Sequence, residues 1–304
     1  AFKQEGHWRI LIAKVRAAAP ALVLTVESKG EAIADISFWD ALDMLGSDAY
    51  FSLAAAKDNS VAELVTAWAR PIALLDHLYK RWQKPILITE VGYQSRPFCY
   101  KTPSATALDN SGLDCSPWAH CFDVDCQAHA YEAFLKVFSQ KSWFAGVYFW
   151  LWRSDPSAGG LADHDFTPKG KPAERVLKLW YNSTSPSPSP VRAELAPVTV
   201  AQPQQHTYPG AKISRNGFVF GMGQWAGSMV RANSSEAFAS VDAAIAAGVN
   251  ALEIPPMWYI VNKTDTSIFP VTDPNSMIRT TDDEELRQLL LYASGKGLRL
   301  AVSP

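Results

Sequence analysis

The stretch Lys84–Tyr93 combines a short apolar run with a carboxylate at its end. Ile86 to Thr89 is apolar or β-branched, which is typical of a strand buried on both faces in a parallel sheet. Glu90 follows at once, and Gly92 then lets the backbone turn sharply. An acid in this position points into the space beyond the sheet, where it is free to take part in chemistry. The alternative is an acid satisfied by a neighbouring arginine or by a backbone N–H.

Strands and helices alternate on both sides of this stretch. Helical spacing predicts helices over Trp8–Ala18, Ala32–Leu45, Val61–Trp82, Cys126–Gln140, Ser234–Ala247 and Asp282–Ser294. Further strands are predicted over Ala21–Val26 (closing on Glu27), the strand end at Gly46–Phe51, Gly146–Trp152, Gly217–Gly221, Ala251–Pro255 and Leu298–Val302. This alternation predicts βαβ units and a parallel sheet. In a (β/α)8 barrel, the space above such a strand end is the active site.

The composition describes a large globular chain with no electrostatic reason to bind nucleic acid. Its 304 residues are 48% hydrophobic, enough for a sizeable core. A net charge of −2 gives no case for nucleic acid or an anionic membrane surface, and no apolar run approaches the roughly 20 residues of a membrane helix. The chain begins at Ala1 without Met or a signal peptide, so we expect a processed form or a piece of something longer.

The cysteines and glycosylation sequons favour an extracellular chain. All four cysteines fall in one polar stretch: Cys99, Cys115, Cys121 and Cys126. Neither a Cys-x2-Cys pair nor paired histidine spacing accompanies them, so we expect two disulfides, in any of three pairings, rather than a metal site. Disulfides imply an oxidising compartment. Asn-x-Ser/Thr sequons at Asn182, Asn233 and Asn262 fit a secreted or cell-surface glycoprotein.

Residues 183–212 differ in composition from the rest of the chain. They hold Ser-Pro-Ser-Pro-Ser-Pro and few large apolar side chains, which predicts a semi-rigid polyproline-II linker. Alternating Ser-Pro suggests O-glycosylation, and a plain spacer is the alternative. We therefore divide the chain into residues 1–182, the linker 183–212 and residues 213–304.

Several motifs resemble one family of glycoside hydrolases. Phe38–Asp43, Asp48–Phe51, Ile88–Ser95, Gly146–Trp150 and parts of 155–172 resemble the second half of a family-113 glycoside hydrolase. Gly217–Trp225, Pro256–Tyr259 and Gly297–Leu300 resemble the first half. The resemblance implies an α/β fold of the (β/α)8 barrel type, in clan A, with β-mannanase-type activity that retains anomeric configuration.

The order of these motifs differs from that of the family. Strands resembling 5 to 8 come first, strands resembling 1 to 3 follow the linker, and the fourth strand, which carries the acid/base glutamate, has no counterpart. A tandem array, a circular permutant and the loss of one βα module all fit this order. A permutant needs a closing loop of only a few residues, so the long linker favours the array. The barrel would then be completed by a neighbouring segment or copy.

The resemblance gives Glu90 the role of nucleophile. A retaining mechanism needs a second carboxyl about 5–5.5 Å away to protonate the leaving oxygen. Glu27 is a candidate acid/base, although a surface or salt-bridged acid is the favoured interpretation. For Glu253 we expect pairing within the core.

Aromatic and acidic residues near strand ends are candidates for sugar binding. Aromatic faces there can stack on sugar rings, and equally can belong to the core. The candidate substrate-binding residues are Asp48, Tyr50, Tyr93 (as a hydrogen-bond partner of the nucleophile), Trp150, Trp152, Asp155, Trp225, Trp258 and Tyr259. Asp155, Asp163 and Asp165 orient sugar hydroxyls or, alternatively, pin the Gly159–Gly160 loop. We expect no metal and no cofactor.

Two functions follow from these observations. One is an extracellular glycoprotein of tandem hydrolase-like barrels, the repeat unit of a fibre or matrix with residual or no catalysis. The other is a secreted retaining endo-β-glycan hydrolase of the mannan type. The absent acid/base strand favours the structural interpretation. Expected partners are a β-linked polysaccharide or oligosaccharide, neighbouring copies, and attached N- and O-glycans, but neither nucleic acid nor membrane.

Overall fold

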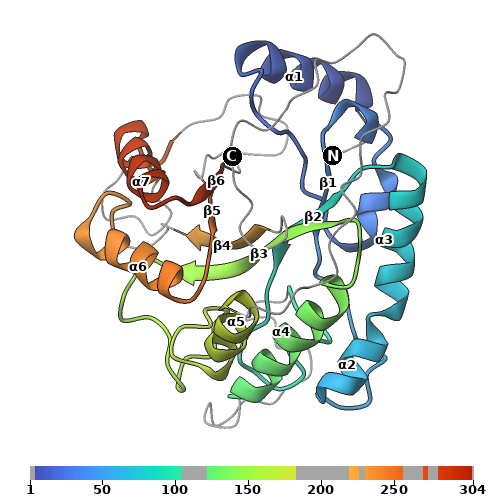
Figure 1. Cartoon of the computed structure of the whole chain (residues 1–304), viewed down its shortest axis with the longest axis vertical. Coiled ribbons are helices and arrows are strands. Elements are labelled where there is room, and N and C mark those ends of the chain that lie inside the picture. Colours follow the sequence, from blue (N-terminus) through green and yellow to red (C-terminus); the bar gives the residue numbers. More distant parts are fainter. Residues whose placement is uncertain are drawn as a thin grey trace.

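The protein folds around one parallel sheet. The computed structural model describes residues 4–104, 122–182, 219–225, 230–255, 270–272 and 280–302. Its strands are β1 (Leu45–Asp48), β2 (Ile86–Val91), β3 (Phe144–Arg153), β4 (Val219–Trp225), β5 (Ala251–Ile254) and β6 (Arg299–Val302), which lie in this order in a six-stranded sheet. Every neighbouring pair is parallel. Figure 1 shows the sheet curving through the middle of the molecule with the helices around it.

The helices lie between the strands in the chain, as βαβ units require. They are α1 (Glu5–Ala18), α2 (Val61–Ala67), α3 (Ala69–Trp82), α4 (Val124–Phe138), α5 (Pro172–Asn182), α6 (Ser235–Ala246) and α7 (Asp283–Gly295). Four begin at a side chain that accepts a hydrogen bond from a backbone N–H of the first turn. These capping residues are Ser60, Asp123, Ser234 and Asp282.

Two helix predictions need correction. The helix expected over Ala32–Leu45 is wrong: the chain forms two short 3-10 turns, η1 (Gly30–Asp35) and η2 (Trp39–Ala41), and then enters β1. The indole N–H of Trp39 donates to the Ile33 carbonyl (3.2 Å), the acceptor that an α-helix would offer to its own backbone. The expected helix over Val61–Trp82 divides at Trp68, and α5 was not predicted.

The strand predicted over Ala21–Val26 does not form, but its residues lie beside β1. The Asp43 carboxylate accepts from the Leu24 N–H (2.7 Å), and the Thr25 hydroxyl donates to the Met44 carbonyl (3.0 Å). These side chains replace the backbone ladder of a regular strand. At Gly46, a Cβ would meet the Val26 carbonyl oxygen at 2.2 Å, so glycine permits the close approach.

The core is densely aromatic on the side of β1, β2 and β3. The rings of Phe134 and Phe138 stack at 4.1 Å, and Trp68 meets the Phe138 ring edge-on at 5.1 Å. A smaller cluster lies under α6 and α7, where Val241, Leu252, Ile254, Leu289 and Ala293 are buried. Both faces of β5 are therefore covered, as expected of a strand inside a parallel sheet.

The linker separates two parts of the chain that share this sheet. Strand β3 pairs with β4 from Gly146↔Val219 to Arg153↔Trp225. The linker itself lies outside the described residues, and the division into three segments stays a prediction. Cys99 and Cys126 form a disulfide. Cys115 and Cys121 lie outside the described residues, so of the two expected bridges the structure shows one.

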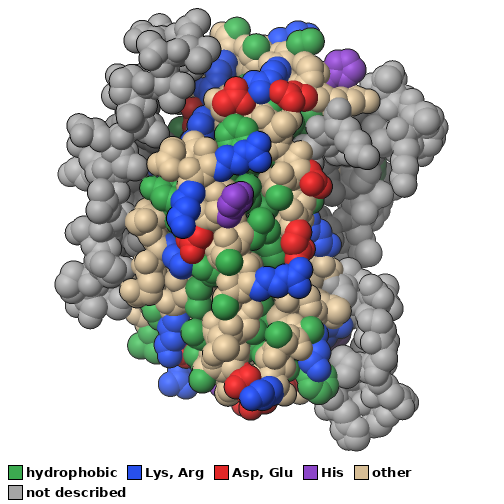
Figure 2. All heavy atoms as spheres, turned by 90° about the vertical axis from the view of Figure 1, so that its right-hand side faces the viewer, with side chains coloured by type: hydrophobic (Ala, Val, Ile, Leu, Met, Phe, Trp, Pro, Cys, Tyr) green, Lys and Arg blue, Asp and Glu red, His purple; other side chains and the backbone are tan. Residues whose placement is uncertain are grey.

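The surface carries charges of both signs. Figure 2 shows the side of the molecule on which α3 lies in Figure 1, with Lys and Arg interspersed among Asp and Glu. This fits the small net charge of −2 and gives no single-sign patch on that face. Among the described helices, none is both long and apolar enough to cross a membrane.

Candidate active site

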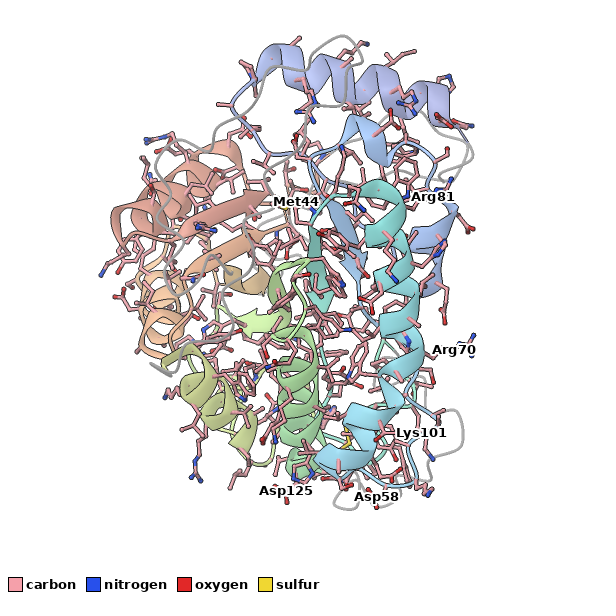
Figure 3. All side chains as sticks on the ribbon, turned by 45° about the vertical axis from the view of Figure 1, so that its right-hand side comes forward. Met44, Asp58, Arg70, Arg81, Lys101 and Asp125 are labelled. Atoms are coloured by element: carbon pink, nitrogen blue, oxygen red, sulfur yellow. A yellow bond between two sulfur atoms is a disulfide. The ribbon has the colours of Figure 1, made fainter. Side chains whose placement is uncertain are left out.

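Carboxylates gather at the carboxyl ends of the strands. Asp48 ends β1, Glu90 is the last residue but one of β2, and these two are register partners. Glu253 lies near the end of β5. Figure 3 shows in which direction the strands run. Met44, just before β1, lies toward one end of the molecule, whereas Asp58 and Lys101, in the loops that follow β1 and β2, lie at the other end. The carboxylates therefore lie at the carboxyl ends of the strands, where (β/α)8 enzymes have their active sites.

Glu90 is held by a tyrosine from the neighbouring strand end. The Tyr50 hydroxyl donates to Glu90 Oε1, and the Ala49 N–H donates to the Glu90 carbonyl at 2.6 Å. Burial raises the pKa of the Glu90 carboxyl, the Tyr50 hydrogen bond lowers it, and the charges of Glu27 and Lys29 act in opposite directions. The tyrosine thus favours the ionised form of a half-buried acid.

Asp48 is the second acid beside Glu90. The Thr89 hydroxyl donates to Asp48 Oδ1 at 2.9 Å. Burial and the negative charges of Glu27 and Glu90 raise the pKa of Asp48 to about 7. Near neutral pH this carboxyl is therefore divided between its protonated and ionised forms.

Glu253 joins the same group from β5. Its side chain is only 8% exposed and is hydrogen-bonded to the Glu27 carboxyl. Burial comes first in raising the pKa of Glu253 well above the ordinary value, followed by the charge and hydrogen bond of Glu27 and by the charges of Glu90 and Asp48. The burial of Glu253 and its bond to Glu27 fit the expectation of pairing within the core.

Two of the predicted sugar contacts are core residues in the structure. Tyr93 is fully buried, its ring meets Tyr131 edge-on, and its hydroxyl has no hydrogen-bond partner among the described residues. The hydroxyl that bonds Glu90 is instead that of Tyr50. Trp152 is 1% exposed, and its indole N–H donates to the Ser240 carbonyl (3.0 Å), which ties β3 to α6.

Trp150 lies near the end of β3, as predicted. Its side chain is half-buried. A Cβ at Gly92 would meet the Trp150 carbonyl oxygen at 2.1 Å, so glycine lets β2 approach β3 closely here. Trp150 is thus fixed beside the strand that carries Glu90, and it remains a candidate sugar contact.

The aspartates after β3 hold their own loop. Asp155 accepts from the N–H and hydroxyl of Ser157 (2.8 and 2.7 Å). Asp163 accepts from the Gly159 N–H (2.9 Å) and pairs with Lys171, whereas Asp165 pairs with Arg153. These bonds fit the alternative in which the acids pin the Gly159–Gly160 loop.

The remaining predicted sites are only partly visible. Trp258, Tyr259 and Asn262 lie outside the described residues, and for Trp225 and Asn182 the backbone alone is described, at the ends of β4 and α5. Asn233 is half-buried in the turn before α6. Glu253 was expected only as a core residue, although an acid near the end of an apolar run is the same signal that singled out Glu90.

The comparison with protein families decides the affiliation. The model of Glycoside Hydrolase Family 113 matches residues 1–171, more than half of the chain. The chain belongs to this family. Family 113 membership implies a (β/α)8-barrel-type fold, of which the described residues form six strands. The predicted resemblance is confirmed.

Solved structures give further likenesses. A GH113 β-1,4-mannanase is 25% identical, with a TM-score of 0.45, over 60% of this chain and 52% of its own. The GH113 β-mannanase AaManA from Alicyclobacillus acidocaldarius, in complex with ManMIm, is 27% identical, with a TM-score of 0.42, over 58% and 50%. A β-D-glucuronidase from Dictyoglomus thermophilum is 15% identical, with a TM-score of 0.40, over 59% and 29%. The chain spans about half the length of these mannanases. A comparison with curated proteins finds no match.

Proposed function

We propose that this chain acts in a secreted retaining endo-β-glycan hydrolase of the mannan type, with Glu90 as its nucleophile. The observation that carries the proposal is the Tyr50–Glu90 hydrogen bond at the carboxyl end of a parallel sheet, inside the segment that matches family 113. The family match favours this function over a fibre or matrix repeat. The Cys99–Cys126 disulfide supports an oxidising, extracellular compartment.

The chemistry follows from the position of Glu90. Its carboxylate attacks the anomeric carbon of a β-linked sugar while the glycosidic bond breaks, which gives a covalent glycosyl-enzyme with inverted configuration. Water then attacks the same carbon and inverts it again, so the product retains the β-anomer. Because Tyr50 holds Oε1, the other carboxylate oxygen is the one that we expect to attack.

The test is to trap the intermediate and identify the labelled residue. A 2-deoxy-2-fluoro-β-mannosyl fluoride carries a leaving group that needs no acid and forms a slowly hydrolysed ester. We expect peptide mass spectrometry to find the label on Glu90, and Glu90→Gln to lower mannan hydrolysis at least about 10³-fold. Glu132→Gln, which removes a half-buried carboxylate paired with Lys136 on α4, is the matched control and should keep full activity. A product of inverted configuration, or a label on another residue, would contradict the proposal.

A further inference from the structure

One aromatic ring in the loop after β2 is held in solvent by an unusual backbone. Phe98 is 46% exposed, whereas residues 91–96, Cys99 and Tyr100 are all buried. We propose that Phe98 is a sugar-binding residue, on which a β-linked glycan chain stacks one of its rings away from the point of cleavage. This inference rests on the proposed function, because it takes the same polysaccharide as its ligand.

The backbone of Phe98 lies in the left-handed region, with φ at 55°. A large side chain rarely takes this conformation, because its Cβ crowds the following carbonyl oxygen, whereas glycine takes it without strain. The exposure of one apolar residue would by itself be ordinary. Here a large exposed ring stands where the backbone favours glycine, and residues strained in this way cluster at binding sites. The ring therefore has a role outside the fold.

The turn that carries Phe98 is fixed on its C-terminal side. Cys99 is joined by a disulfide to Cys126 in the first turn of α4. The Lys101 N–H donates to the Phe98 carbonyl (2.9 Å), which closes the turn. A ring that is held in place before the ligand arrives loses little conformational freedom on binding.

This loop is bonded to the segment that positions the candidate nucleophile. The Leu53 N–H donates to the Tyr100 carbonyl at 2.9 Å. Leu53 lies three residues after Tyr50, whose hydroxyl donates to Glu90. Tyr100 lies two residues after Phe98. The loop with the exposed ring and the loop that bonds Glu90 are thus neighbours.

The position of Lys101 shows on which side of the molecule the ring lies. Figure 3 places Lys101 at the same end as Asp58, beyond the carboxyl ends of β1 and β2. Lys101 Nζ lies 4.2 Å from the centroid of the Phe98 ring. The ring therefore lies at the end of the molecule that the substrate approaches.

A ring with an ammonium group beside it suits a neutral sugar. The C–H face of a pyranose can stack on the Phe98 ring, and the Lys101 ammonium has three N–H donors for the hydroxyls at the edge of that pyranose. A long chain cleaved at Glu90 continues past the point of cleavage, whereas a trisaccharide ends close to it. Phe98 therefore favours long substrates over short ones.

The experiment measures binding in a full chain that carries Glu90→Gln and so does not cleave its ligand. Isothermal titration calorimetry gives the Kd of β-1,4-mannohexaose and of β-1,4-mannotriose. We expect Phe98→Ala to raise the Kd of mannohexaose about 5- to 10-fold and that of mannotriose less than about 2-fold. Phe98→Tyr keeps the ring and should keep both values. Leu179→Ala, which removes a 70% exposed side chain on α5, is the matched control.

Phe98→Gly separates binding from stability. Glycine takes a φ of 55° without strain, so this variant should melt above Phe98→Ala, yet bind mannohexaose no better. If the ring served only the fold, binding would recover with stability. That recovery, equal losses on the two oligosaccharides, or an unchanged Kd for mannohexaose in Phe98→Ala would overturn the proposal.

The background chain distinguishes failure of this inference from failure of the proposed function. If the Glu90→Gln chain binds mannohexaose and Phe98→Ala changes nothing, this inference alone fails. If that chain binds neither oligosaccharide, this inference fails again, and the mannosyl label on Glu90 decides whether the proposed function stands without it.

Discussion

Two glutamates near the ends of buried strands have different chemistry because they meet different partners. Burial raises the pKa of Glu90, and the hydrogen bond from the Tyr50 hydroxyl opposes this rise. Glu253 is bonded to another carboxyl among three acids, which favours its protonated form. The two carboxyls are thus distinguished by their neighbours rather than by residue type.

Tyr50→Phe tests the first of these partners. Without the hydroxyl, the pKa of Glu90 should rise further, so the acidic limb of the kcat/KM profile should move to higher pH and kcat should fall roughly 10- to 100-fold. Tyr93→Phe is the matched control, because the Tyr93 hydroxyl is buried without a described partner. It should leave activity unchanged and keep or raise the unfolding free energy, by about 1 kcal/mol at most. Equal effects of the two changes would rule out the assignment to Tyr50.

Asp48→Asn tests the electrostatic cost of the cluster. Burial and the neighbouring acids raise the pKa of Asp48 to about 7 in the folded protein, from an ordinary value of 3.8. Since the folded state holds the proton more tightly, Asp48 stabilises the fold at low pH, and this contribution is lost as the pH rises through about 7. Asparagine keeps an acceptor for the Thr89 hydroxyl but carries no charge.

We therefore expect the free energy of unfolding of Asp48→Asn above pH 7 to exceed that of the unmodified chain by on the order of 2 kcal/mol. This value allows for screening by the water that reaches the half-buried group. Urea denaturation at pH 5 and pH 8 measures the difference. If Asp48→Asn raised the free energy of unfolding as much at pH 5 as at pH 8, the ionisation of Asp48 would not be the cause of the stabilisation.

At the scale of elements, the alternation of strands and helices was predictable. The apolar run before Glu90, the run Gly146–Trp152 and the capped helices near Ser234 and Asp282 all formed with small shifts in their ends. Each has a local signal: a β-branched run, or a capping residue before helical spacing.

The segment before β1 could not be predicted, because distant side chains decide it. The Leu24 N–H donates to the Asp43 carboxylate, and the Trp39 indole N–H donates to the Ile33 carbonyl. These contacts override the local pattern. The bond between Glu27 and Glu253 was likewise hidden, since it joins residues far apart in the chain. Only the acid at the end of each apolar run was visible beforehand.

Gly46→Ala tests how this irregular segment is positioned. The added Cβ would lie 2.2 Å from the Val26 carbonyl oxygen, and backbone must move to relieve the clash. We expect the free energy of unfolding to fall by about 2–4 kcal/mol, and mannan hydrolysis to fall with it because the segment beside β1 is displaced. Gly6→Ala in α1, where nothing lies within 4 Å of the new Cβ, should leave stability unchanged or slightly raised. An unshifted melting temperature in Gly46→Ala would show that the close approach is not needed.

At the scale of the whole molecule, the described strands leave one edge of the sheet unpaired. The six parallel strands lie side by side in the order β1 to β6. Among the described residues, β6 pairs with β5 on one side and with no strand on the other. The side chains of Leu300 and Val302 are 36% and 47% exposed, whereas β5 is buried throughout. Closed barrels have no such edges, and an apolar open edge is a site for pairing with another strand.

We therefore expect the chain to self-associate through β6, as a barrel completed by a neighbouring copy requires. Sedimentation equilibrium should show a reversible association that Val302→Lys weakens at least about 10-fold, because a lysine on an edge opposes pairing with a second strand. Leu179→Lys, at a 70% exposed leucine on α5, should leave the association unchanged. If the shared edge also shields the carboxylates from water, specific activity should rise with protein concentration over the same range. A monomer at every concentration, with full activity, would mean instead that residues of the same chain cover the β6 edge.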